Sequence, residues 1–206
     1  MMNLPRQNAD EFLKNIELHE QWLSTRHSGA SSLGRQLSMS QQYVSDCVIN
    51  GRMLVAVQFI RCFFENVEFI NCNFGAVMMP LITCINCKFN DCGLYKSDLI
   101  VGTYVACEFK NSNLAKAELN QSVFSHCDFS DADLRQASLR NTCLRFSAFN
   151  AVDFREARLS DTEFHITESY KTKSIEGIVL KNISITTSSM AFEPLSDEAA
   201  AEKLFS

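Results

Sequence analysis

The sequence lacks the features that mark several common classes of protein. No apolar run approaches the length of about 18 residues that a membrane-spanning helix needs. Residues 1–13 contain no basic segment followed by an apolar one, so we expect no secretory signal and a cytoplasmic location. A phosphate-binding glycine loop, an HExxH zinc motif and a Walker pattern are also missing. These absences exclude a membrane protein and the enzyme classes that such motifs define.

Histidine is scarce, and no group of catalytic residues can be assembled from the pattern. None of the four histidines has the local context of a nucleophile with its base: His19, His27, His126 and His165. Many acidic residues, such as Asp98 and Asp133, occupy outward positions where a solvated charge is the ordinary interpretation. We therefore predict no enzyme, no cofactor and no catalytic, cofactor-binding or metal-binding residue.

What the sequence does contain is an apolar residue at every fifth position from Leu54 to Phe164. All 23 of these positions hold an apolar or aromatic residue when Cys84 is counted, and the residue two places before each is mostly small. A helix repeats every 3.6 residues or so and a strand about every 2, so a period of five fits neither. It requires a chain that turns a corner in each unit, so that four corners close a coil of twenty residues. Such coils stack about 4.8 Å apart.

Individual units resemble the repeat of the pentapeptide-repeat family. That unit is a small residue, then Asp or Asn, then Leu or Phe, then two variable residues, as in Ser112–Lys116, Cys127–Asp131 and Ala132–Gln136. The resemblance implies an all-β solenoid, a right-handed quadrilateral parallel β-helix, here of about six coils. The family is functionally mixed, so the likeness indicates the fold better than the activity.

The pattern divides the chain into four parts. We predict an N-terminal capping helix in 1–29, an irregular first coil in 30–53, the β-helix in 54–166 and a C-terminal cap or tail in 167–206. Asn8 is a plausible N-cap of a helix over 8–28 with Gly29 as its stop, and this helix either closes the core or serves as an exposed docking helix. After Phe164 the five-residue phase fails.

The C-terminal part contains two candidate elements. Residues 175–185 are rich in β-formers, and 196–205 read as a short helix. Either segment covers the last coil or pairs with another chain, so a homodimer through a terminal element is an open alternative.

The twenty-residue coil predicts which residues stack. One face carries an aromatic column that we call the Phe ladder: Phe69, Phe89, Phe109, Phe129 and Phe149. The favoured interpretation is core, and the alternative is a slot for an aromatic ligand. Seven of the nine cysteines fall on the small inward position, which favours buried thiols in a reducing compartment: Cys47, Cys62, Cys72, Cys87, Cys92, Cys107 and Cys127. Stacking of Cys87, Cys107 and Cys127 would allow a disulfide or a metal by distance alone, which we regard as the weaker alternative.

Three outward patterns are candidates for function. An apolar patch spans three coils and consists of Ile60, Met78, Pro80, Leu81, Ile100 and Val101. It is either an exposed partner site or a surface covered by a terminal element. A column of Asn and Asp at one corner, such as Asn71 and Asp91, is explained by turn chemistry. An arginine collar on three successive faces of one coil, either solvated or facing an anionic partner, consists of Arg135, Arg140 and Arg145, with Arg155 and Arg158 one coil on.

The outward patterns favour a non-catalytic protein-binding scaffold, and family analogy suggests an immunity protein that binds and blocks a toxin. The alternative is a DNA-mimicking ligand of DNA gyrase or topoisomerase that gives drug or toxin resistance, and a secreted effector module is a further alternative. A DNA mimic needs a long acidic face, whereas residues 54–166 contain ten Lys or Arg against thirteen Asp or Glu. We expect a protein partner, no direct contact with nucleic acid and no membrane.

Overall fold

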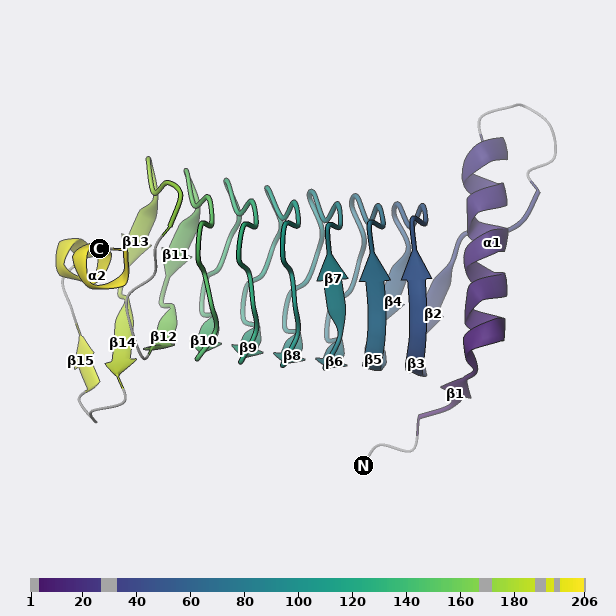
Figure 1. Cartoon of the computed structure of the whole chain (residues 1–206), viewed down its shortest axis with the longest axis horizontal. Coiled ribbons are helices and arrows are strands. Elements are labelled where there is room, and N and C mark those ends of the chain that lie inside the picture. Colours follow the sequence, from purple (N-terminus) through teal and green to yellow (C-terminus); the bar gives the residue numbers. More distant parts are fainter. Residues whose placement is uncertain (1–3, 27–32, 167–171, 188–191, 195–196, 206) are drawn as a thin grey trace.

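The chain folds into a parallel β-solenoid of about seven turns with a helix at each end (Figure 1). The computed structural model describes residues 4–26, 33–166, 172–187, 192–194 and 197–205. Helix α1 (Ala9–Thr25) lies at the first end of the stack and helix α2 (Asp197–Phe205) at the other. The predicted fold class is therefore confirmed. No helix in the described ranges combines the length and the hydropathy that crossing a membrane requires.

Short strands pair in parallel with the strand one coil away, and only β14 and β15 pair antiparallel among the described strands. The strands are β1 (Arg6–Gln7), β2 (Ser38–Ser40), β3 (Tyr43–Asn50), β4 (Gln58–Ile60), β5 (Phe63–Ile70), β6 (Thr83–Ile85), β7 (Lys88–Asn90), β8 (Thr103–Val105), β9 (Val123–Ser125), β10 (Cys143–Arg145), β11 (Arg158–Ser160), β12 (Glu163–Ile166), β13 (Val179–Lys181), β14 (Ser184–Thr187) and β15 (Phe192–Pro194). Residues twenty apart stack on one another, as in Phe69 over Phe89.

A left-handed backbone conformation at every fifth residue produces the corners. From Gln41 to Asp161 each corner has a positive φ, mostly between 50° and 61°. Asn and Asp tolerate this conformation better than other side chains because they form local hydrogen bonds. The stacked Asn71 and Asp91 have φ values of 53° and 55°, in agreement with the turn chemistry expected for their column.

The Phe ladder fills one side of the core. Its five rings are buried, with consecutive centroids 4.9–5.3 Å apart and interplanar angles between 5° and 18°. The stacked rings occupy the space that an aromatic ligand would need. They therefore act as core residues.

The small inward residues fit into the limited space of the core and also form hydrogen bonds. A hydroxyl or thiol at this position donates to a backbone carbonyl of the preceding coil, as in Ser122 Oγ to Leu99 O (2.8 Å) and Cys92 Sγ to Phe69 O (3.4 Å). All nine cysteines are free thiols, and eight of them are buried. Burial raises the pKa of Cys47 and of Cys62 to about 11, so these thiols stay protonated.

Helix α1 closes the first end of the core. The side chain of Asn8 accepts a hydrogen bond from the backbone N–H of Glu11 (2.8 Å), as the N-cap prediction required, and the helix ends at Thr25. Residues 27–29, which include the predicted stop, lie outside the described residues. Phe12 is buried against three core phenylalanines, with ring centroids 6.0–6.5 Å away: Phe59, Phe64 and Phe69.

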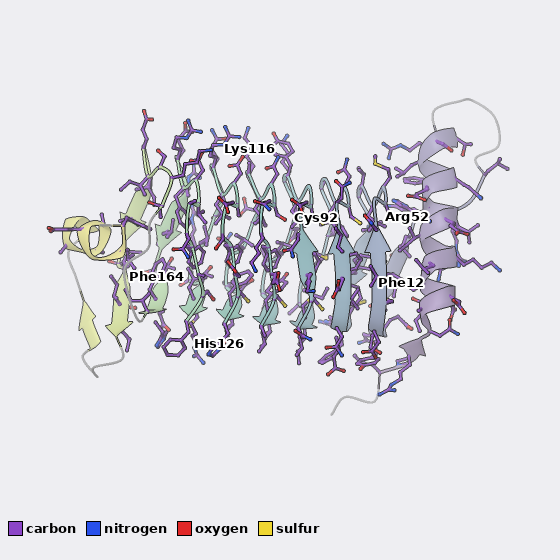
Figure 2. The ribbon with its side chains drawn as sticks, in the orientation of Figure 1. Phe12, Arg52, Cys92, Lys116, His126 and Phe164 are labelled. Atoms are coloured by element: carbon purple, nitrogen blue, oxygen red, sulfur yellow. The ribbon has the colours of Figure 1, made fainter. Side chains whose placement is uncertain are left out.

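The first coil is regular from Ser38 onward, in contrast to the irregular coil expected for 30–53, of which residues 30–32 lie outside the described residues. Met39, Val44 and Ile49 are buried and pair in register with the next coil. Arg52 occupies a position that is small elsewhere, at the end of the stack that α1 covers. Its guanidinium instead reaches Glu20 of α1 (3.1 Å), beside the helix in Figure 2.

The solenoid also continues beyond Phe164, where the sequence pattern predicted that the phase fails. The stacking offset is 20 within the regular coils, as in Asn86 on Asn66, and 21 in the last one, as in Asn182 on Asp161. Strand β13 pairs with β11 and β14 pairs with β12, so this part forms a further coil and not a loose tail. Together with the regular first coil, it accounts for seven turns in place of six.

Candidate protein-binding surface

The apolar patch lies on one corner of the solenoid and the strand positions beside it. Ile60, Pro80 and Ile100 each follow a buried central residue, and Leu81 and Val101 are the corner residues that come next. The backbone N–H of Leu81 donates to the carbonyl of Ile100 one coil above (3.0 Å). The structure therefore places these positions in one strip over three coils. Polar residues interrupt it, with Arg61 at the corner below Leu81 and Met78 stacked between Gln58 and Asp98.

Much of this strip faces solvent. The exposed fractions are 40% for Met78, 42% for Leu81 and 39% for Val101, and the other three patch residues are half-buried. Within the described residues, α1 packs on β3 and α2 packs on β13, at the two ends of the stack (Figure 1). The described helices therefore leave the patch uncovered.

The backbone conformation of Val101 is unfavourable for a β-branched residue. It has a φ of 55°, and it is the one β-branched side chain among the described left-handed corners. The left-handed conformation costs about 1–2 kcal/mol for most L-residues, and β-branching makes it worse. Neither burial nor turn chemistry explains a valine at this corner.

Two of the five arginines of the collar, Arg135 and Arg155, make intramolecular ion pairs. Arg135 makes a forked contact with Asp133, at 2.6 Å for its shortest bond. Arg155 pairs in the same way with Asp153 (2.7 Å), and this hydrogen-bonded pair lowers the pKa of that carboxyl group. Arg140 and Arg145 lie on other faces, so the structure does not gather the collar into one anion site.

A hollow beside the collar is polar. It has a volume of about 300 Å³ and is lined by Tyr95, Ala115, Lys116, Arg135, Gln136, Arg155 and Glu156. Lys116 lies at the upper edge of the stack and His126 at the lower edge (Figure 2). The hollow and the lower edge are therefore separate surfaces.

The acidic side chains do not form an uninterrupted stripe. Glu68, Lys88, Glu108 and Asp128 stack in one column, so a cation interrupts the acidic residues. Lys88 Nζ lies 2.8 Å from Glu68, and Lys110 Nζ lies 3.1 Å from Asp128 and 3.3 Å from Glu108. These contacts neutralise the column, although surface pairs of this kind add little stability.

Sequence reasoning missed a cluster near the second end. Cys143, Glu163 and His165 place one ligand atom each within 4.8 Å of the others. Cys143 and Glu163 stack directly because β10 pairs with β12, and His165 lies two residues further along the same outward face. The sequence did contain a signal for this cluster. Cys143 and Glu163 are twenty residues apart, and Glu163 and His165 are two apart on the same face of a strand.

Comparison with known proteins identifies the repeat. Residues 107–145 match the model of pentapeptide repeats in eight copies. The chain contains pentapeptide repeats. Its repeats extend beyond the matched stretch, because the same five-residue register of corners runs from Gln41 to Asp161.

Solved structures of other proteins match the chain at low identity. A trypsin-treated form of QnrB1, described as a plasmid-mediated fluoroquinolone resistance protein, is 18% identical, with coverage of 68% of this chain and 92% of that one and a TM-score of 0.46. HetL, involved in heterocyst differentiation regulation in Nostoc sp. strain PCC 7120, is 14% identical, with coverage of 86% and 94% and a TM-score of 0.27. Rfr23 from the cyanobacterium Cyanothece 51142 is 12% identical, with coverage of 70% and 84% and a TM-score of 0.24. No curated protein matches the sequence.

Proposed function

We propose that this pentapeptide-repeat protein is a non-catalytic, cytoplasmic scaffold that binds another protein through the apolar patch. The observation that carries the proposal is the pair of corner residues Leu81 and Val101, which are apolar, exposed and in the left-handed conformation. Contiguous exposed apolar surface marks partner sites, and a rigid surface loses little conformational entropy on binding.

The partner class that we propose is a toxin, which the protein would bind and block. Family analogy supports this choice. The mixed surface charge argues against a DNA mimic, because Lys88 and Lys110 form ion pairs with the acidic residues of the column. DNA mimicry of a gyrase ligand needs a continuous negative field, and Lys88 interrupts the column where one would run. The gyrase role therefore ranks below the immunity role.

The experiment is affinity capture from the native host lysate with three forms of the protein. Leu81→Asp places a charge in the centre of the patch, and Gln121→Asp places the same charge at the same corner two coils above. We expect wild type and Gln121→Asp to retain one partner and Leu81→Asp to lose it, with all three melting within a few degrees of one another.

Several outcomes decide among the alternatives. A partner retained by Leu81→Asp means that the patch is not the binding surface, and unfolding of Leu81→Asp means that the patch belongs to the core. Recovery of gyrase subunits together with protection of gyrase in a supercoiling assay would replace the immunity role with the gyrase role. Recovery of a protein that is toxic when expressed alone would support immunity.

A further inference from the structure

The outward face of β10 and β12 carries a set of side chains that neither the repeat nor the proposed function explains. These strands pair in parallel, with Cys143 on Glu163 and Arg145 on His165 (Figure 1). Alternate residues of a strand point to the same face, and neighbouring strands lie about 4.8 Å apart. The four side chains therefore stand at the corners of a small square on a rigid backbone.

Three of the four side chains are metal ligands by type. The Sγ of Cys143, a ring nitrogen of His165 and a carboxylate oxygen of Glu163 all lie within 4.8 Å of one another. Thiolate, imidazole and carboxylate are the donors that zinc uses, at about 2.0–2.3 Å from the ion. Only side-chain rotation is needed to bring the three atoms around one ion, because the backbone already sets their spacing.

We propose that Cys143, Glu163 and His165 form a zinc site with one position open to water or to a fourth ligand. Cys143 and His165 are half-buried, so two of the three donors are partly held by their surroundings, while exposed Glu163 supplies the third. The site links one coil to the next just before the one-residue change of register. Bound zinc therefore fastens the last coils of the solenoid to the regular stack.

Arg145 is the competitor for the site. Its Nε lies 3.2 Å from Cys143 Sγ, where it donates to the sulfur. A cation cannot share that position with a zinc ion, so the guanidinium must swing away when the metal binds. Arg145 has an exposed side chain and is free to make that movement.

The test uses Co²⁺ as a spectroscopic probe on the full chain. A thiolate bound to Co²⁺ gives a charge-transfer absorption that the buried cysteines cannot produce without unfolding. We expect wild type to show this band, Zn²⁺ to remove it by competition, and Cys143→Ser to lack it. His165→Gln and Glu163→Gln are each expected to weaken Co²⁺ binding about tenfold or more, by comparison with losses known for groups around metal sites.

Two further variants separate a built site from chance binding. His126→Gln changes an exposed histidine on the same edge and is expected to leave Co²⁺ binding unchanged. Arg145→Gln is expected to tighten binding by roughly thirtyfold, the effect of removing a unit charge about 4 Å from a divalent ion in water. In wild type Zn²⁺ should also raise the melting temperature, and Cys143→Ser should abolish that shift.

The proposal is overturned if wild type shows no thiolate band, or if Cys143→Ser binds Co²⁺ as wild type does. Weaker binding in Arg145→Gln would also overturn it, because that result would make the guanidinium a supporting group and not a competitor. Unchanged far-UV circular dichroism of each variant shows that loss of binding is not loss of fold. The site is independent of the apolar patch, so either proposal can fail alone.

Discussion

At the scale of the residue, His19 shows how one buried side chain fixes its own protonation state. The N–H of Leu37 donates to Nδ1 of His19 (3.1 Å), so this nitrogen carries no proton. The proton must be on Nε2, which then donates to the carbonyl of Val55 (3.1 Å). The histidine on the apolar stripe of α1 is therefore a packed, neutral residue that joins the helix to two coils.

This arrangement predicts a pH dependence of stability. Burial lowers the pKa of His19 below its ordinary 6.5, although the Val55 hydrogen bond and Glu20 act in the opposite direction. The unfolded chain then takes up the proton first as the pH falls. The contribution of His19 to the free energy of unfolding is therefore at its maximum above pH 6.5. It decreases as the pH falls from 6.5 toward the pKa of His19 in the folded protein.

Urea unfolding at several pH values tests this prediction, with His19→Gln as the control. The glutamine can accept from Leu37 and donate to Val55 but does not titrate. We expect the difference between wild type and His19→Gln to shrink as the pH falls below 6.5. A difference that stays constant across that range contradicts the assignment of a neutral, buried ring.

Val101 permits a second prediction at this scale. Val101→Asn should increase the free energy of unfolding by about 1 kcal/mol, because Asn tolerates the left-handed corner that strains Val. The reverse change at the same corner two coils above, Asn141→Val, should decrease it by a similar amount. Chemical denaturation of both variants measures the effect. A loss of stability in Val101→Asn would mean that apolar contacts of the valine outweigh its backbone strain.

At the scale of the element, α1 acts as a plug. Phe12, Ile16 and His19 are its buried residues, and they cover the open end of the core. A solenoid is stabilised by contacts between neighbouring coils, so an uncovered end coil frays first. The salt bridge between Glu20 and Arg52 lies at the rim of this contact and adds little beside the apolar burial.

Phe12→Ala should therefore reduce the free energy of unfolding by about 3–5 kcal/mol, the usual cost of removing a buried phenylalanine. Leu13→Ala is the control, because Leu13 is only partly buried on the same helix and should cost much less. Hydrogen exchange should show the loss concentrated in α1 and β3. Uniform loss along the stack would mean that the coils unfold as one unit and that α1 is not a separate lid.

At the scale of the whole molecule, the solenoid buries nearly all of its cysteine thiols. Eight cysteines are buried and Cys143 is half-buried on an outward face. Burial also raises the pKa of Cys143 and of the buried thiols of Cys47, Cys62 and Cys84. The protonated, buried thiols are protected both from solvent and from ionisation.

A thiol reagent should consequently modify Cys143 first in the native protein, and the other eight thiols only on unfolding. Peptide mapping after brief labelling identifies the site, and Cys143→Ser should leave no early label. A reducing agent should not change the melting temperature, because all nine cysteines are free. Early labelling at any inward cysteine would show that the coils open locally in the native state.

The repeat was readable from sequence because its information is local. Each five-residue unit contains its own central apolar residue, its small residue and its corner residue. The register, the stacking and the Phe ladder can therefore be predicted by counting residues along the sequence. The corner Asn and Asp residues and the N-cap Asn8 are also local signals, and the structure contains them where the sequence placed them. The apolar patch was predicted in the same way, from outward positions on three stacked coils.

The tertiary structure decided what happens where the repetition ends. One extra residue shifts the last coil by a single position, and the pattern cannot show that Ile185 still stacks on Phe164. Arg52 breaks the rule of small residues only because α1, distant in sequence, supplies Glu20. The meeting of Cys143, Glu163 and His165 likewise depends on side chains from different coils. Local spacing specifies the coil, whereas the surface is decided by which side chains of neighbouring coils reach one another.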